Sequence, residues 1–422
     1  MVEIKISEND CGVGFCIFMR HPRSLFFLYV MKIFSKPSVL ITLFFLSFFS
    51  CRKVYDPPAI KANNHFLAVD GVIQTGINVS TAITVSRSLN LDDSVPNIPE
   101  LNAQVAIVSS NGTTIGLHDT SGTGVYVSPL MTLDSSVNYQ VAITTSDGNK
   151  FISDFVTPKS APPVDSLSWE VVNDPVTLQQ AVNVYVNAHD PTNKTQYYRW
   201  DYLETYKHLS VLETPWGEAN GIIFPLDVGY STHSCWSTNR SNNILLGSSV
   251  NLSQDVIAHA LIATYQQNDP KLDIGNSILV RQYPLTAEAY NYWLTVQKNS
   301  QTLGGLFDLQ PSQISGNLHC TTNPKNPVLG YISASSVQEL RIYISNHSLT
   351  GWKSNPLYSC IQYTLPLDQL NLSIYNYPDT AYGPYHYAGD LIVFLVVAPK
   401  SCMDCRYQGG VNVKPSFWPA FD

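Results

Sequence analysis

Residues 65–158 alternate between apolar and polar positions, with the two-residue period of a β-strand that has one buried face. Turn dipeptides separate the apolar runs, and Asn111-Gly112 and Asp147-Gly148 supply the positive φ that tight hairpins require. Six or seven strands in such a segment, with no convincing helix, are typical of an immunoglobulin-like or transthyretin-like β-sandwich. The expected strands are 65–73, 77–86, 103–109, 125–129, 139–145 and 151–157.

A second β-rich region, 164–400, follows a proline-containing linker at 159–163. In the run YYRWDYLETY, at 197–206, aromatic residues alternate with polar partners, as in a central strand with one buried face. This pattern predicts a larger β-sandwich-type domain, followed by a cysteine-containing tail at 401–422. The expected strands are 166–172, 181–188, 197–206, 277–283, 328–335 and 339–345.

One segment of this second region has the spacing of a helix rather than of a strand. Thr286 is a suitable N-cap, and Ala289, Trp293 and Val296 form an apolar stripe with helical spacing. We therefore predict one inserted α-helix over 287–298. The fold class expected from the whole pattern is mainly β.

An unbroken apolar run at 39–49 precedes the β-rich region, with Lys32 and Lys36 before it and Ser50-Cys51 after it. A bilayer-spanning helix needs about 20 apolar residues, so this run has the length of a signal-peptide core. A small residue followed by cysteine is the arrangement at which a lipoprotein signal is cut. The sequence therefore predicts a lipoprotein signal peptide at 31–50 and lipidation of Cys51.

The remaining boundaries follow from this signal. Residues 1–30 are then an upstream extension that results from a start codon assigned too early, and residues 51–64 form a lipidated tether. The protein is expected to be bound to a membrane through its N-terminal lipid. Arg52 and Lys53 directly follow the cysteine, which leaves the periplasmic and the cell-surface face both open. Two alternatives for the apolar run at 39–49 are that it forms a single-pass membrane anchor or a buried helix.

Composition narrows the classes of partner. Charged residues make up only 13% of the chain, against about 25% in ordinary proteins, and the net charge is -8. Binding to nucleic acid needs clustered Lys and Arg on a basic surface, so no nucleic-acid partner is expected.

After the predicted signal and Cys51, the chain has five cysteines, and we expect most of them to pair because an exported protein meets an oxidising environment. Five cysteines allow fifteen ways to form two disulfides, and the sequence does not choose among them. The C-x-x-C spacing near the C-terminus also fits a redox dithiol or half of a zinc site, although no second close pair exists. The five are Cys235, Cys320, Cys360, Cys402 and Cys405.

Several stretches, in this order and spacing, resemble the Bacteroidota outer-membrane lipoprotein family catalogued as domain of unknown function 4249. The resemblance implies an outer-membrane lipoprotein, typically encoded beside TonB-dependent receptors. It implies no catalytic residues, because none are established for the family. The stretches are 197–206, Cys235-Trp236, 277–299, 304–320, 326–344 and 402–418.

Little in the sequence suggests catalysis. His233 and Cys235 lie two positions apart, which on a strand places both on one face, so a Cys–His dyad is one hypothesis. An incidental histidine beside a disulfide cysteine is the simpler interpretation. No catalytic residue, metal site or cofactor is therefore predicted.

The strongest candidate binding surface is rich in tyrosine. Tyrosine offers a large rigid face and a hydroxyl at a small entropy cost, and binding loops use it for this reason. The alternative is that these rings fill gaps between loops of the second domain. The five residues are Tyr375, Tyr377, Tyr382, Tyr385 and Tyr387.

Together these patterns suggest a non-enzymatic outer-membrane lipoprotein that binds a solute or a protein partner. We expect it to be accessory to a TonB-dependent transporter. The alternative is a structural or adhesive protein of the cell envelope, which tandem β-sandwiches would also suit.

Overall fold

A computed structural model describes most of the chain after residue 64. The predicted signal, the tether with Cys51, and Tyr375 and Tyr377 lie outside the described residues. The described residues are 65–89, 98–173, 179–219, 222–227, 229–301, 316–352, 360–366, 382–388 and 394–419.

The first β-sandwich has two sheets that share one core. One sheet has the order β21-β1-β3-β4, with β7 beside β3, and the other has the order β20-β10-β9-β5-β6. Alternate apolar residues of both sheets, such as Val85 and Val141, are fully buried between them. The strands are β1 (Leu67–Gln74), β3 (Ala82–Arg87), β4 (Ile98–Pro99), β5 (Gln104–Ser109), β6 (Thr114–Leu117), β7 (Val125–Val127), β9 (Tyr139–Thr144), β10 (Lys150–Ser153), β20 (Leu318–Cys320) and β21 (Val328–Ser335); a separate ribbon pairs β2 (Gly76–Val79) with β8 (Met131–Leu133).

Two strands of this sandwich come from far along the chain. Strand β21 runs parallel to β1 over its full length, and β20 pairs with β10. Their order in the sequence places them within the predicted domain 164–400, whereas their hydrogen bonds place them in the first sandwich. Ile332 and Ala334 complete its core, and Asn317 holds Ile332 through two hydrogen bonds of 2.8 Å. A parallel pair requires a long crossover, and no local pattern marks it.

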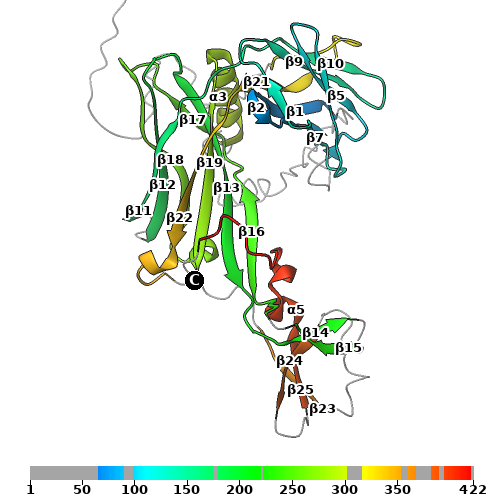
Figure 1. Ribbon diagram of the computed structural model, residues 1–422, viewed down its shortest axis with the longest axis vertical. Helices are drawn as coiled ribbons and strands as arrows, with labels where there is room; N and C mark the ends of the chain where they lie inside the picture. Colours follow the sequence, from blue (N-terminus) through cyan, green and yellow to red (C-terminus); the bar gives the residue numbers. More distant parts are fainter. Residues whose placement is uncertain are drawn as a thin grey trace, which may run out of the picture. The chain divides into compact units, whose positions relative to one another are not determined.

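The second β-sandwich is larger, as expected, and the mainly-β fold is confirmed (Figure 1). A three-stranded sheet, β11-β12-β18, shares a core with a five-stranded sheet, β16-β13-β19-β22 with β17 beside β13. Val184, Trp200 and Val280 lie in this core. The strands are β11 (Val164–Asn173), β12 (Gln180–Asp190), β13 (Tyr197–Leu209), β16 (Ser234–Arg240), β17 (Leu245–Ser248), β18 (Asp255–Gln266), β19 (Gly275–Pro284) and β22 (Gln338–Ser345).

Strand β18 is long, yet the sequence pattern does not predict it. Its register with β12 shifts twice, next to Val184 and next to Val186, and His259 has a positive φ of 55°. Each bulge moves the side chains that follow to the other face, so the two-residue period breaks. Irregular pairing therefore hides this strand from an argument based on alternation.

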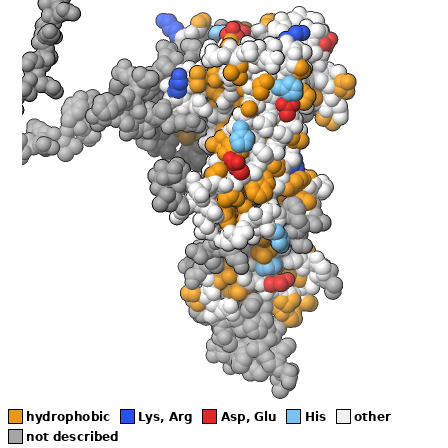
Figure 2. All heavy atoms as spheres, turned by 90° about the vertical axis from the view of Figure 1, so that its left-hand side faces the viewer, with side chains coloured by type: hydrophobic (Ala, Val, Ile, Leu, Met, Phe, Trp, Pro, Cys, Tyr) orange, Lys and Arg blue, Asp and Glu red, His pale blue; other side chains and the backbone are white. Residues whose placement is uncertain are grey.

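The outer face of the three-stranded sheet is polar. Tyr185 stacks on His259 with ring centroids 3.8 Å apart, and the Nδ1 atom of His189 lies 2.7 Å from a carboxylate oxygen of Asp165. Figure 2, which views the molecule from this side, shows hydrophobic side chains scattered among polar ones and few Lys or Arg side chains. This is the ordinary appearance of a solvated sheet face.

The inserted helix is confirmed as α3 (Ala287–Gln301). The backbone N–H of Ala289 donates to Oγ1 of Thr286 at 3.2 Å, which is the expected N-cap bond. Ala289 is fully buried, and Tyr290 packs on Tyr197 of β13. None of the helices in the described part of the chain combines the length and the apolar character needed to cross a bilayer.

The remaining elements form a small unit that we call the C-terminal lobe. It combines the β14–β15 hairpin with the three-stranded sheet β23-β25-β24 and two short helices. Its elements are β14 (Trp216–Ala219), β15 (Ile222–Pro225), β23 (Tyr363–Pro366), β24 (Tyr382–Ala388), β25 (Phe394–Pro399), α5 (Lys400–Met403) and η4 (Cys405–Gln408); the other short helices are η1 (Pro270–Leu272) and η2 (Asn346–Ser348).

The pairing of β1 with β21 can be tested at Gly330. This residue has a φ of +133°, and an added Cβ would lie 2.0 Å from the carbonyl oxygen of Val69. We expect Gly330→Ala to lower the free energy of unfolding by about 2–4 kcal/mol, measured by urea denaturation. Gly116→Ala is the control, because the nearest atom to its Cβ, Nε2 of His118, is 3.9 Å away. Equal stability of the two variants would contradict the pairing.

Candidate functional site

The C-terminal lobe contains a cavity of about 410 Å³. Residues from β14, from β15 and the segment before β16, and from α5 and η4 line it. A cavity of this size lies in the range of small-molecule sites. The large side chains in its lining include Trp216, Phe224, Tyr230, Met403, Arg406 and Tyr407.

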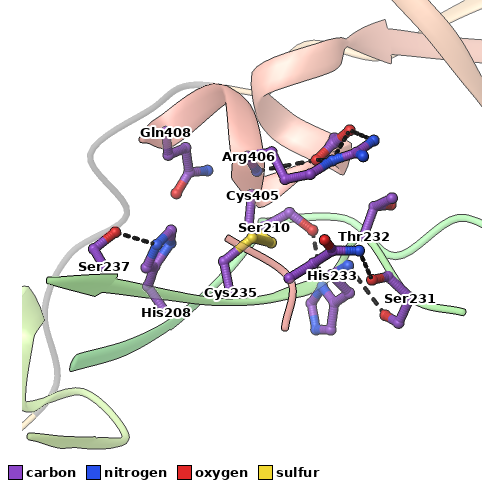
Figure 3. Close-up of a disulfide and its surroundings, with 12 residues drawn as sticks. His208, Ser210, Ser231, Thr232, His233, Cys235, Ser237, Cys405, Arg406 and Gln408 are labelled. Atoms are coloured by element: carbon purple, nitrogen blue, oxygen red, sulfur yellow. Dashed lines mark hydrogen bonds and ion pairs between the residues drawn. A yellow bond between two sulfur atoms is a disulfide. The ribbon is translucent and has the colours of Figure 1, made fainter. Parts of the chain in front are cut away.

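Two disulfides hold the helices that form one wall of this cavity. Cys235 of β16 is bonded to Cys405 of η4 (Figure 3), and Cys360 is bonded to Cys402 of α5. The two cysteines of the C-x-x-C pair therefore form disulfides with partners elsewhere in the chain and not with each other. Cys320 is a buried thiol in the core of the first sandwich.

Hydrogen bonds add to the disulfides. The N–H of Cys405 donates to the carbonyl oxygen of Thr232 at 2.9 Å, and the Thr232 hydroxyl donates to the carbonyl oxygen of Met403 at 3.2 Å. The N–H of Leu212 donates to the carbonyl oxygen of Cys402 at 2.8 Å. The short helices are thus fixed to the loops that precede and follow the hairpin, which preorganises the cavity wall.

The hypothesis of a Cys–His dyad is wrong, because Cys235 has no thiol to ionise. The Nδ1 atom of His233 lies 2.9 Å from the hydroxyl of Ser210, as Figure 3 shows. The pKa of the neighbouring His208 is lowered by burial, which a hydrogen bond to the side chain of Gln408 only partly opposes. Its Nε2 atom lies 2.9 Å from the Ser237 hydroxyl.

Arg406 and Asp404 form the polar part of the site. Nε and Nη2 of Arg406 lie 2.9 Å and 2.6 Å from the two carboxylate oxygens of Asp404, and Nη1 donates to the Tyr230 hydroxyl at 2.9 Å. The hydrogen bonds from Arg406 to Asp404, together with the negative charge of that carboxylate, raise the pKa of Arg406 although burial lowers it. The pair is neutral overall, and its planar N–H and carboxylate groups are fixed in orientation.

The aromatic rings around this pair are unusually exposed. Phe224, Tyr230 and Tyr407 have 42%, 44% and 58% of their surface accessible to solvent. Exposed rings beside an oriented polar pair suit the capture of a ligand with both apolar and polar surface. Within the described ranges, no group of three or more His, Cys, Asp or Glu side chains could hold a metal ion.

The predicted tyrosine surface is only partly placed. Tyr382, Tyr385 and Tyr387 belong to β24, which pairs with β25 and contacts β14 of the lobe. Their backbone therefore lies in the same lobe as the cavity, while Tyr375 and Tyr377 lie outside the described residues.

Sequence reasoning missed Trp216, Tyr230, Arg406 and Tyr407. The one available signal was the position of Arg406 and Tyr407 directly after a cysteine, because residues next to a disulfide are held rigidly. Nothing local connects them with Trp216, almost 200 residues earlier. The disulfide between β16 and η4 brings these segments together.

Residues 52–341 match the sequence model of the family described as domain of unknown function (DUF4249). The chain belongs to this family. The DUF4249 match covers both β-sandwiches and the β14–β15 hairpin, but it ends before Cys360, α5 and η4. One wall of the cavity thus lies within the DUF4249 segment and the other lies beyond it.

Two solved structures show a distant likeness. A DUF4785 family protein from Legionella pneumophila is 11% identical, with a TM-score of 0.16, over 51% of this chain and 52% of that one. The alpha-2-macroglobulin of E. coli is 10% identical, with a TM-score of 0.17, over 73% of this chain and 15% of that one. This chain therefore spans about half of the first protein and a small part of the second. No curated protein matches the sequence.

The disulfide pairing gives a direct test. Peptide mapping of the unreduced protein by mass spectrometry should recover Cys235 linked to Cys405 and Cys360 linked to Cys402. Thiol titration in denaturant should detect Cys320. Recovery of a linked Cys402–Cys405 peptide would contradict the arrangement, because the C-x-x-C pair would then form an internal disulfide and would not anchor the lobe.

Proposed function

We propose that this DUF4249 protein is a non-enzymatic outer-membrane lipoprotein, anchored through Cys51, that binds a solute or a protein partner through the C-terminal lobe. The short apolar run before Ser50-Cys51 supports the lipid anchor. The family resemblance to Bacteroidota lipoproteins encoded beside TonB-dependent receptors supports a role accessory to such a transporter.

The observation that carries the proposal is the exposed aromatic wall of the cavity. Phe224, Tyr230 and Tyr407 remain open to water although the lobe around them is fixed by two disulfides. Exposed rings in a rigid frame bind with little loss of conformational entropy, which is why aromatic side chains dominate binding hot spots. A purely structural lobe would gain more stability by burying them.

The polar pair supports binding rather than chemistry. Arg406 is already neutralised by Asp404, so neither group is poised as a nucleophile or as an acid near neutral pH. The N–H groups of Arg406 that do not bond Asp404 or Tyr230 can instead donate to amides or hydroxyls, because this side chain is 45% exposed. A peptide or a sugar offers such groups beside apolar surface.

The alternative, a structural or adhesive envelope protein, has one observation in its favour. Strand β21 inserts into the first sandwich next to β1, and this links the two sandwiches at more than one point. A gene deletion that alters envelope integrity or attachment, while nutrient uptake is unchanged, would favour this role over transport.

The lipid anchor has its own test. Mass spectrometry of the protein from native membranes should find Cys51 as the acylated N-terminal residue. Cys51→Ser should release the protein from the membrane fraction, because several acyl chains supply the anchoring energy, at about 0.8 kcal/mol per buried CH₂. An internal, unacylated residue 51 would overturn the proposed location.

Partner binding is tested by solubilising native membranes with mild detergent and recovering the lipidated protein. We expect it to co-purify with a large β-barrel, and Tyr230→Ala combined with Tyr407→Ala should reduce recovery of the partner about tenfold or more. Phe155→Ala is the matched control, since Phe155 is 48% exposed but lies in the first sandwich. Recovery of the native protein alone, at full yield, would count against the transporter role.

A further inference from the structure

Arg199 of β13 is buried without a counter-ion. Only 9% of its surface is exposed, and its guanidinium lies 4.2 Å from the ring centroid of Trp293 and 5.3 Å from that of Tyr283. Among the described residues, no carboxylate, carbonyl or hydroxyl oxygen accepts a hydrogen bond from it. Ring faces offset part of the cost of burying the charge, but they do not satisfy its five N–H donors.

The nearest carboxylate is already occupied. Asp201, two residues along β13 on the same face, is 6% exposed. One of its oxygens lies 2.6 Å from Nε of Arg281, and the other lies 2.9 Å from Nη2 of Arg240. The Tyr283 hydroxyl also points to it, at 3.3 Å. Asp201 therefore already accepts hydrogen bonds from two other arginines and a tyrosine, and none from Arg199.

Arg281 has an unused donor as well. Its Nη2 atom is buried and makes no hydrogen bond. Burial lowers the pKa of Arg281, but the hydrogen bond and the charge of Asp201 outweigh this and raise the pKa overall. Arg281 is thus charged, with one side of its guanidinium facing Asp201 and an N–H of the other side unpaired. A buried, unpaired N–H of this kind costs free energy unless a ligand satisfies it.

The two arginines are near enough to share one ligand. Strand register pairs Arg199 with Tyr283 and Asp201 with Arg281, so Arg199 and Arg281 are diagonal neighbours on one face. Such positions are about 7–8 Å apart, within reach of long side chains.

The charge balance around this pair is positive. Three arginines, at 199, 240 and 281, face one buried carboxylate at Asp201. Glu339, the exposed neighbour of Arg281 on β22, also acts on it, but no ion pair joins these two within the described ranges. Since a buried net charge is costly, the cluster favours an anion that supplies the missing oxygens.

We propose that Arg199 and Arg281 form a binding site for an oxyanion group, either a carboxylate or a phosphate, on the face of the five-stranded sheet next to helix α3. The guanidinium fork matches both groups with two parallel N–H···O bonds. Trp293 of α3 holds the Arg199 plane, and Arg240, whose side chain is 56% exposed, marks the route from solvent. This site is separate from the cavity of the C-terminal lobe.

The test is calorimetric titration of the full-length mature protein with inorganic phosphate, sulfate and succinate at constant ionic strength. We expect saturable binding of at least one of these anions above a chloride reference, and Arg199→Gln should weaken it about tenfold or more. Succinate binding alone would assign a carboxylate ligand, and phosphate or sulfate binding alone would assign a tetrahedral one.

Arg341→Gln is the matched control. Arg341 lies on the same sheet face, but its Nη1 already donates to the Ser277 hydroxyl at 2.6 Å, and its guanidinium covers the ring of Phe417. The affinity of the Arg341→Gln variant for the anion should stay within about twofold of that of the unmodified protein. Arg199→Lys keeps the charge and loses the fork, so it should fold and still bind more weakly than the unmodified protein. The absence of saturable binding, or equal affinity in the Arg199 and Arg341 variants, would overturn the proposal.

Discussion

The hydrogen-bonded ladder of strand β13 is the constraint on which both candidate sites depend. Over its length this strand pairs with β19 on one side and with β17 and then β16 on the other. A strand with neighbours on both edges cannot shift its register without turning every side chain to the other face. Tyr198 and Trp200 are thereby fixed in the core, and Arg199 and Asp201 are fixed on the opposite face.

The same ladder positions the C-terminal lobe. His208 of β13 lies opposite Cys235 of β16, and Cys235 carries the disulfide to η4. The lobe is built from short sheets and short helices, and small units of this kind commonly need covalent links. Disulfides that close long loops contribute about 2–5 kcal/mol each, which is comparable with the stability of a small domain. The aromatic rings of the cavity can remain exposed to solvent because the disulfides and the hydrogen bonds stabilise the backbone that carries them.

The two proposed sites would bind their ligands through different interactions. In the lobe, Arg406 is paired with Asp404 and the aromatic rings are exposed, so a ligand would gain binding free energy mainly by covering aromatic surface. On the sheet face, Arg199 is buried between rings and has no hydrogen-bond acceptor among the described residues. A ligand would gain binding free energy there mainly by accepting hydrogen bonds from the charged guanidinium. One chain therefore offers a surface for a mixed polar and apolar ligand and another for an anion.

Much of the fold could be predicted because alternation is local. The two-residue period located the longest strands apart from β18, among them β11, β12, β13 and β19, and the stripe after Thr286 located helix α3 within a few residues. The run at 197–206 was predicted as a central strand with one buried face. Its charged positions, at 199, 201 and 204, are buried as well. Trp293 of α3 covers Arg199, whereas the two carboxylates are held by Arg281, Arg240, Tyr265 and Lys271. Bulges hid β18, since they break the period by which strands are found.

The sequence by itself determined the strand-rich class, the inserted helix and the supply of cysteines, because each depends on neighbouring residues along the chain. Tertiary structure alone decided that β21 joins the first sandwich, that Cys235 meets Cys405, and that Arg199 lies beside Arg281 without a counter-ion. These contacts join segments tens to hundreds of residues apart. Their energy comes from burial and pairing in three dimensions, which no local pattern of side chains encodes.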